Sequence, residues 1–268
     1  MIVSGLEVCD GFTDNSLPHQ MLVEFIQGHL GSVEDRMIAR SVVRIVLAGN
    51  SIATPDQVNR GETKASSQKL QFNASRNAKQ FDILLAQILS SCPVDLIPGP
   101  TDPVNYLMPQ QPIHPCQLPH SSRFNTLSLH CNPYECRIGS RTFLGHSGQP
   151  VTDILLQTTS ESNGTFDEKN RNLSVLHRTL KWSHLAPTAP DTTPCFSFSK
   201  VDPFVINLAP DVLFCGNQQA FSTKLVALPK GGFSRLICIP SFKETKEVVL
   251  LELNSLECRT ICFDVLRT

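Results

Sequence analysis

Polar side chains that could do chemistry stand where four apolar, strand-like segments end. Three segments end in Ser4-Gly5-Leu6, Gly49-Asn50-Ser51 and Gly216-Asn217-Gln218-Gln219, and another leads into Pro98-Gly99-Pro100-Thr101-Asp102. In α/β sheets, sites are usually built at the carboxyl ends of the strands. Two metal ions held there would clamp a phosphate group and lower the pKa of a bridging water. These stretches, however, carry hydroxyl, amide and aliphatic side chains, with Asp102 as their one carboxylate.

The most distinctive stretch of the chain runs from Val94 to Pro119 and reads VDLIPGPTDPVNYLMPQQPIHPCQLP. Proline fixes its own φ and biases the residue before it towards extended conformations. The stretch is therefore predicted to be a rigid surface loop that leaves the carboxyl end of a strand, and neither a helix nor a mobile linker.

The composition is that of an ordinary globular protein, with 268 residues, 41% hydrophobic and 18% charged, and a net charge of -1. This balance argues against a strongly basic nucleic-acid clamp, because non-specific affinity for DNA comes largely from Lys and Arg. A local basic patch remains compatible with it. The sequence shows no secretory signal and no apolar run of the ~20 residues that a membrane span needs.

The ten cysteines are scattered, and no pair has the C-x-x-C spacing that is typical of zinc sites. Most of them stand in apolar runs, such as Leu213-Phe214-Cys215 and Ile237-Cys238-Ile239. We expect reduced, buried thiols that pack as small hydrophobic side chains, in a protein of the cytosol or the nucleus. No cysteine and histidine show the pattern of an activated nucleophile.

Hydrophobic periodicity predicts alternating strands and helices over the first half of the chain. Strands are expected at 1–6, 42–48, 94–97 and 126–129. Helices are expected at about 16–30, 75–91 and 173–182. Residues 52–75 and 158–172 are polar and are expected to be mobile loops. A hairpin is expected over 137–144, followed by a turn at 145–149 and an apolar segment at 151–156.

From Asp211 onwards the pattern changes to five strands, VLFCG, KLVALP, RLICIP, VVLLEL and TICFDV, with a hairpin turn at Gly231-Gly232. We interpret them as an antiparallel run. The expected fold class is therefore mixed α/β (α+β), with two packed mixed β-sheets flanked by helices and with antiparallel strands at the C-terminus.

Several long segments resemble the family of the small, non-catalytic subunit of DNA polymerase delta. These segments are VRIVLAGN, VDLIPG, DPVNYLMPQQPIHPC, NPYE, FLGHSGQPVTDI, HLAPTAPDT and PDVLFCGNQQAF. The family belongs to the calcineurin-like phosphoesterase superfamily, whose fold is a β-sandwich flanked by helices. The chain departs from the family pattern at Pro100-Thr101 and in the polar stretch 160–170.

The resemblance implies a single phosphoesterase-like domain over residues 1–268, without the oligonucleotide-binding-type β-barrel that precedes it in the family. A chain that opens on a strand also suggests a truncated product or an incomplete gene model. The domain is expected to be catalytically inactive, with no metal and no cofactor. The positions of the family's lost metal ligands correspond to Ser4, Leu6, Asn50, Asp102, Asn217 and Gln219.

The resemblance further implies a nuclear accessory subunit that acts in DNA replication and repair. Its expected partner is the C-terminal metal-binding domain of the catalytic subunit of DNA polymerase delta. Contacts with other subunits of that complex stay open, and DNA is expected to be contacted only indirectly or weakly. The alternatives are a small subunit of another replicative polymerase, or an active metallophosphoesterase with unconventional ligands.

Exposed apolar side chains on a rigid loop suit a protein interface, where aromatic residues and Met are enriched. The candidate partner-binding residues are Tyr106, Leu107, Met108, His114 and Leu118. The alternative is that they pack only within the chain.

The remaining candidates for metal binding have simpler interpretations. Asp102, before Pro103, is expected to close a turn, and His114 to form hydrogen bonds inside the loop. His146 is expected to be a solvent-facing turn residue, and His184 to be structural.

Overall fold

The computed structural model describes residues 1–9, 16–53, 64–158, 168–198, 200–229 and 231–264, with the backbone alone for 16, 64–73 and 168–170. The helices are α1 (Ser16–Ile26), α2 (Val33–Ser41), α3 (Lys64–Leu89), α4 (Gln149–Thr158), α5 (Glu168–Trp182) and α6 (Phe242–Thr245), with 3-10 turns at Pro115–Gln117 and Ser121–Arg123. The strands are β1 (Ile2–Val3), β2 (Ile45–Ala48), β3 (Val94–Ile97), β4 (Leu127–Leu129), β5 (Tyr134–Ile138), β6 (Arg141–His146), β7 (Val212–Gln218), β8 (Ser222–Ala227), β9 (Phe233–Pro240), β10 (Glu247–Leu251) and β11 (Cys258–Cys262).

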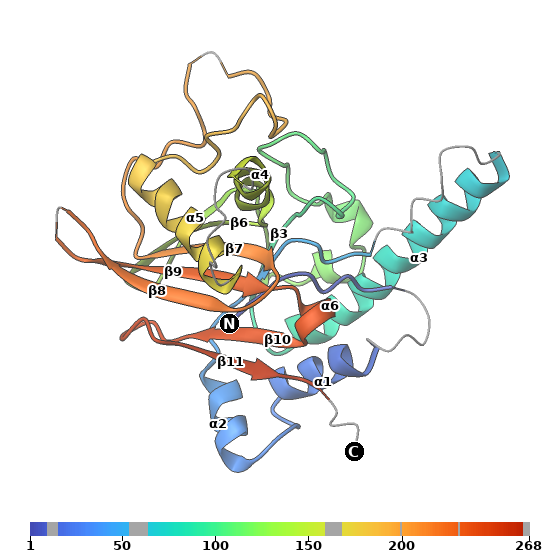
Figure 1. Ribbon diagram of the computed structural model, residues 1–268. Coiled ribbons are helices and arrows are strands. Elements are labelled where there is room, and N and C mark those ends of the chain that lie inside the picture. The colour runs from blue at the N-terminus through green and yellow to red at the C-terminus, as the bar shows by residue number, and fades with distance from the viewer. Residues whose placement is uncertain (10–15, 54–63, 159–167, 199, 230, 265–268) are drawn as a thin grey trace.

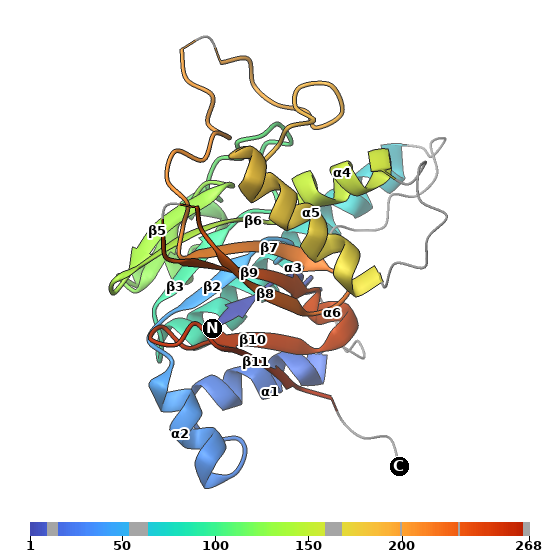
Figure 2. The ribbon, with the colours of Figure 1, turned by 60° about the vertical axis from the view of Figure 1, so that its left-hand side comes forward.

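The strands form two sheets that pack face to face. The first has the order β11-β10-β1-β2-β3-β4 and the second the order β5-β6-β7-β9-β8. Helices α1, α2 and α3 lie against the first sheet, and α4 and α5 lie on the outer side of the second (Figures 1 and 2). The structure therefore confirms the expected mixed α/β architecture of two sheets flanked by helices.

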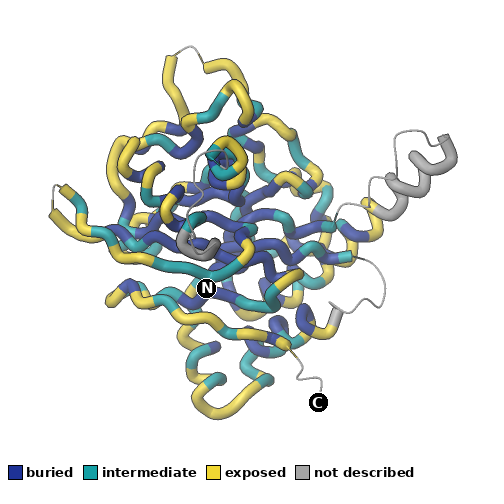
Figure 3. Tube along the Cα trace, in the orientation of Figure 1, coloured by how far each residue is buried: buried dark blue, intermediate teal, exposed yellow. Residues whose placement is uncertain are grey.

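Three apolar cores explain why the central strands are apolar at every position. In β2, Ile45 and Leu47 face the core beneath α1 and α3, whereas Val46 and Ala48 face the core between the sheets. A third core separates the second sheet from α4 and α5. Strands that are covered on both faces lose the alternation of apolar and polar residues. Figure 3 shows these strands as the buried interior of the molecule.

Two helices differ from the sequence-based expectation. Helix α3 begins at Lys64, so the loop expected over 52–75 is wrong for residues 64–75, and residues 54–63 lie outside the described part. Its first turns are rich in Lys, Ala, Ser and Gln, and Lys, Ala and Gln are good helix formers, so their polarity did not indicate a loop. Helix α2 was not predicted, although Ser32 and Asp35 form a capping box at its start, a recognisable signal of a helix N-terminus.

The second expected loop, over residues 158–172, is also helical where it is described. Helix α5 begins at Glu168, so the loop is wrong for residues 168–172, and residues 159–167 lie outside the described part. The apolar segment 151–156 belongs to helix α4. The inward residues expected of α5, Leu173, Leu176 and Leu180, are all buried.

The C-terminal strands do not form one antiparallel run. Strand β7 pairs in parallel with both β6 and β9, while β8 joins β9 as an antiparallel hairpin. Strands β10 and β11 form another hairpin that belongs to the first sheet. The local hairpins were predictable because their turns are short, but the parallel pairings join segments that are distant in sequence.

The expected buried thiols are confirmed only in part. All ten cysteines are free, but only Cys92, Cys215 and Cys238 are buried. Cys116, Cys131 and Cys262 are exposed, because an apolar neighbour in the sequence does not determine the side of a strand or loop on which a side chain lies. In the part of the chain that is described, no helix is long and apolar enough to cross a membrane.

Candidate functional site

The carboxyl ends of β2, β3, β6 and β7 meet at one edge of the packed sheets. Gly49, directly after β2, has a φ of +83°, and a Cβ added to it would lie 2.3 Å from the Ser147 Cβ after β6. A Cβ added to Gly216 in β7 would lie 2.4 Å from the Ala48 carbonyl oxygen. The strand ends are therefore in direct backbone contact, and glycine is required where they meet.

Ser4 and Asn217 belong to a hydrogen-bond network at this edge. The Ser4 hydroxyl donates to the Pro240 carbonyl at 3.0 Å and accepts the Asn217 backbone N–H at 2.9 Å. The Asn217 side-chain amide donates to the Ser147 carbonyl at 2.7 Å. Its Oδ1 atom is buried and has no partner among the described residues.

Asp102 closes the turn after β3, as the sequence predicted. Its Oδ1 accepts the backbone N–H groups of Ser51 and Ile52, both at 2.9 Å, and its Oδ2 accepts that of Gly99 at 2.7 Å. Burial raises the pKa of Asp102 to about 6, against the opposing effect of these hydrogen bonds. The carboxylate thus ties the end of β2 to the loop after β3.

Asn50 also lies in this corner, with a φ of +53°, and its Oδ1 accepts the Thr101 N–H at 3.3 Å. Two other predicted positions lie elsewhere. Leu6 is buried in the core beneath the first sheet. Gln219 is exposed, and it is Gln218 that turns inwards, where its Nε2 donates to the Gly216 carbonyl at 2.8 Å. Asn217 has a φ of +56°, and the pairing of β7 with β9 shifts register between Cys215 and Gln218, so the regular alternation of side chains is interrupted at this strand end.

His146 was also predicted wrongly. Strand β6 continues through His146 and pairs it with Cys215 of β7, so the side chain is fully buried and does not face solvent. Its Nδ1 accepts the Gly148 N–H at 3.0 Å, and its Nε2 has no partner in the described part of the chain. Burial lowers the pKa of His146 to about 4, so the imidazole is neutral at physiological pH.

Sequence reasoning missed a buried cluster of polar side chains beside these residues. The Asn132 side-chain amide donates to Gln110 Oε1 at 2.8 Å and to Ser147 Oγ at 2.7 Å. Gln149 Nε2 donates to the same Gln110 oxygen at 2.8 Å. The signal was present in the motifs NPYE, SGQP and MPQQP, but their polar residues come together only in the folded chain.

The side chains at this edge do not supply the ligands that a pair of hydrolytic metal ions would need. No group of three or more His, Cys, Asp or Glu that could hold a metal occurs in the described residues. Both Asp102 oxygens already accept backbone N–H groups. Asn50 and Asn217 supply neutral amides, which offset the repulsion between two dications far less than carboxylates would.

A pocket of about 330 Å³ opens at this edge. Its lining includes Asn50, Ser147 and Asn217 from the strand ends, together with Tyr106 and Leu156. The candidate site is therefore a largely apolar hollow with the amide and hydroxyl groups of the strand ends in its wall, and the proline-rich loop contributes to it.

The proline-rich loop presents only some of the predicted partner-binding residues. Tyr106 is 69% exposed and Leu107 37% exposed, and His114 is also exposed. Met108 and Leu118 are buried, so their assignment to an exposed interface was wrong. Met108 packs in the core under the second sheet and Leu118 in the core under the first, because both sides of the loop are anchored to the body of the protein.

Two further histidines act within the chain. His114 Nδ1 lies 2.5 Å from Cys116 Sγ and 3.3 Å from the Cys116 backbone nitrogen, which confirms its hydrogen bonding inside the loop. The contact brings a cysteine and a histidine together, but it does not test the expectation that no such pair forms an activated nucleophile. His184 Nε2 lies 2.9 Å from Asp202 Oδ2 and fixes the segment after α5, as expected of a structural residue.

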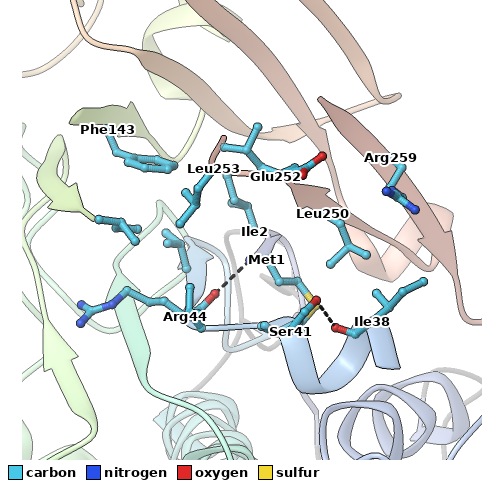
Figure 4. A pocket seen from close by; sticks show the side chains of 15 residues that line it. Met1, Ile2, Ile38, Ser41, Arg44, Phe143, Leu250, Glu252, Leu253 and Arg259 are labelled. Atoms are coloured by element: carbon cyan, nitrogen blue, oxygen red, sulfur yellow. Dashed lines mark hydrogen bonds between the residues drawn. The ribbon is translucent and has the colours of Figure 1, made fainter. Parts of the chain in front are cut away.

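A separate pocket, of about 370 Å³, lies at the amino-terminal ends of β1 and β2 (Figure 4). Met1, Ile2 and Leu250 give it a largely apolar lining. The Met1 amino group donates to the Arg44 carbonyl at 2.9 Å, and burial lowers its pKa to about 6. This pocket is at the opposite end of β2 from Asn50, so it is not part of the strand-end site.

Comparison with known proteins places the chain in a family. The family of the B-type subunits of DNA polymerases alpha and epsilon matches residues 1–223. The chain is 40% identical to a DNA polymerase delta small subunit of Arabidopsis thaliana and 38% identical to one of Oryza sativa, over 98% of this chain in both cases. It is 36% identical to DNA polymerase delta subunit 2 of Drosophila melanogaster over 88% of this chain.

The matches cover 57%, 58% and 53% of those three relatives, so the chain spans a little over half of their length. A solved structure described as a novel archaeal phosphodiesterase aligns over 97% of this chain and 96% of its own, at 12% identity and a TM-score of 0.44, which is too low to establish a common fold. On the sequence matches, the chain belongs to the family of B-type DNA polymerase subunits, and its matched relatives are DNA polymerase delta small subunits.

Proposed function

We propose that this chain is a non-catalytic accessory subunit of a DNA polymerase delta. On this proposal it binds the C-terminal metal-binding domain of the catalytic subunit and supports assembly of the holoenzyme in the nucleus, during DNA replication and repair. Residues 1–268 act as one phosphoesterase-like domain. Other subunits of the complex bind nearby, and contact with DNA is indirect or weak.

The observation that carries the proposal is the combination of a strand-end site without metal ligands and an exposed aromatic and aliphatic surface beside it. The family match supports the same conclusion. A hydrolase of this superfamily would need a carboxylate where Asn50 stands and an imidazole where Asn217 stands. Both Asp102 oxygens accept backbone N–H groups and therefore hold the strand ends in place. On this proposal, the surface around the site binds another protein.

We define the loop face as Tyr106, Leu107 and Phe196. Tyr106 and Leu107 precede Met108, whose backbone N–H donates to the Pro194 carbonyl and whose carbonyl accepts the Phe196 N–H, both at 2.9 Å. Phe196 is 39% exposed. Two backbone hydrogen bonds thus hold an exposed tyrosine, leucine and phenylalanine close together, and aromatic residues are enriched at protein interfaces.

Co-expression with the C-terminal domain of the delta catalytic subunit tests the proposal. We expect the two to co-purify, and Tyr106→Ala with Leu107→Asp to weaken binding by at least about tenfold. Leu208→Asp is the control, because Leu208 is 85% exposed and lies outside the loop face. A folded chain that fails to co-purify, or a double variant that binds as well as the control, would contradict the proposal.

The two alternatives are decided by further arms of the same study. Preferential co-purification with the corresponding domain of another replicative polymerase would replace delta by that polymerase. Manganese-stimulated hydrolysis of a phosphodiester, abolished by Asp102→Ala, would show that the scaffold is an active enzyme. Hydrolysis is not expected, because the amide side chains at the strand ends are poor ligands for two metal ions.

A further inference from the structure

From Lys169 onwards, helix α5 carries cations and no carboxylates, and the strands that it contacts, β7, β8 and β9, also carry no carboxylates. No Asp or Glu occurs between Lys169 and Pro190, a stretch that includes nearly all of α5, and none between Val212 and Lys243, which includes β7, β8 and β9. Helix α5 contacts both β8 and β9, and Figure 1 shows it lying across them. Two acid-free segments are therefore packed against each other in a protein whose net charge is only -1.

The exposed side of α5 gathers these cations in one stripe. Arg171, Arg178 and Lys181 lie at helical spacings that place them on neighbouring positions of the same side. Leu173, Leu176 and Leu180 occupy the opposite, buried side. Arg178 and Lys181 are exposed and Arg171 is half-buried. No ion pair with any of the three is found in the described structure.

Strand β8 adds Lys224 to this stripe. Lys224 has the same parity along the strand as Val226, which packs in the core beneath α5, so both side chains lie on the side that α5 covers. Lys224 itself is exposed. Burial lowers the pKa of His177, and Lys181 and Lys224 lower it further, so the two lysines lie close enough to act on one imidazole from two different elements.

Trp182 completes the stripe with a flat aromatic surface. It is the only tryptophan in the 268-residue sequence, and it is 52% exposed. It follows Arg178 by four residues, so the indole and the guanidinium are neighbours on the helix surface. From Arg171 to Trp182 the stripe is about 16 Å long, at about 1.5 Å per residue.

We propose that this α5–β8 stripe, made of Arg171, Arg178, Lys181, Trp182 and Lys224, binds single-stranded nucleic acid. Unpaired cations attract phosphates, and an exposed indole beside guanidinium groups offers a stacking surface for an unpaired base. An acidic peptide would use the cations but would leave the indole without a stacking partner. The stripe does not depend on the loop face, so this proposal and the proposed docking function are tested separately.

The emission of Trp182 reports directly on the stripe. We expect an oligodeoxythymidine of about 20 nucleotides to quench it, because stacking places a base on the indole. Four cations give a slope of about -3 for log K against log salt, so affinity falls about 50-fold between about 50 and about 200 mM salt. No quenching at about 50 mM salt, or quenching without salt dependence, would overturn the proposal. This titration needs no variant.

A charge-matched pair of variants locates the binding. Arg178→Gln, Lys181→Gln and Lys224→Gln together should weaken anisotropy-detected binding by about tenfold or more and reduce the slope to about -1. Arg36→Gln, Arg40→Gln and Arg259→Gln remove the same charge from exposed positions on α2 and β11 and should leave binding unchanged. Equal losses in both triple variants, or competition by poly-glutamate as strong as by the oligonucleotide, would overturn the assignment.

Discussion

The buried His146 makes the stability of the protein depend on pH. In the folded chain, burial lowers its pKa to about 4, whereas an unfolded histidine titrates near about 6.5. As the pH falls, the unfolded chain therefore binds the proton first. The stability contributed by the neutral imidazole is complete above about pH 6.5 and is lost towards about pH 4; the linkage relation gives a loss of about 2 kcal/mol between about pH 7 and about pH 5.

The hydrogen bonding of His146 explains why its protonation would destabilise the folded chain. The Nδ1 lone pair accepts the Gly148 N–H, so protonation at that nitrogen would break the hydrogen bond as well as bury a charge. In His146→Asn, Oδ1 can accept the same N–H, but the side chain does not titrate. We expect the free energy of unfolding of this variant to fall by about 2 kcal/mol less than that of the wild type over the same pH range.

Urea denaturation of both proteins at about pH 7 and about pH 5 measures the difference. Asp102 acts in the opposite direction, because burial raises its pKa to about 6 and the folded chain binds that proton first. Its effect is common to both proteins and cancels in the comparison. His29→Asn, which removes an imidazole that is 67% exposed, is the control. If wild type and His146→Asn change in parallel, within about 0.5 kcal/mol, the reasoning is refuted.

Two further predictions concern the packing at the two ends of β2. Gly49→Ala should lower the free energy of unfolding by about 3 kcal/mol, because the added Cβ would lie 2.3 Å from the Ser147 Cβ. Gly139→Ala is the control, since Gly139 also has a positive φ but faces open space, and it should lower the free energy of unfolding by only about 1 kcal/mol. Equal losses of stability in the two variants on thermal denaturation would contradict the argument. Asp95→Asn should lower the free energy of unfolding, measured by urea denaturation, by about 3 kcal/mol, because the buried Asp95 carboxylate binds Arg44 at 2.7 Å. A loss below about 1 kcal/mol would argue against this role of the ion pair.

The fold could be predicted where burial alone shapes the sequence. Strands β2 and β3 are apolar at nearly every position because both faces are covered, and the sequence indicated both of them. The first turns of α3 were mistaken for a loop, since a helix of polar residues and a polar loop have similar compositions. The pairing of β7 with β6 and β9 could not be predicted, because those contacts join residues far apart in the sequence.

The candidate site was predictable by position but not by orientation. Ser4, Asn50 and Asp102 lie at the strand-end edge where the motifs placed them. The exposure of Gln219, the burial of Gln218 and the burial of Met108 could not be predicted, because a sequence does not reveal which way a side chain turns at an irregular strand end or in a loop. Proline spacing predicted a rigid loop but not which of its apolar residues anchor it.

Gln110 holds the base of the proline-rich loop by hydrogen bonds. Its side chain is 1% exposed and donates to the carbonyls of Gly99 and Asn105, at 3.3 and 3.1 Å. Its backbone exchanges two hydrogen bonds with Asn132, at 2.8 and 3.0 Å. These four hydrogen bonds fix the base of the loop just beyond Tyr106 and Leu107. A partner that docks on the loop face therefore has less conformational entropy to remove, and more of the contact energy appears as affinity.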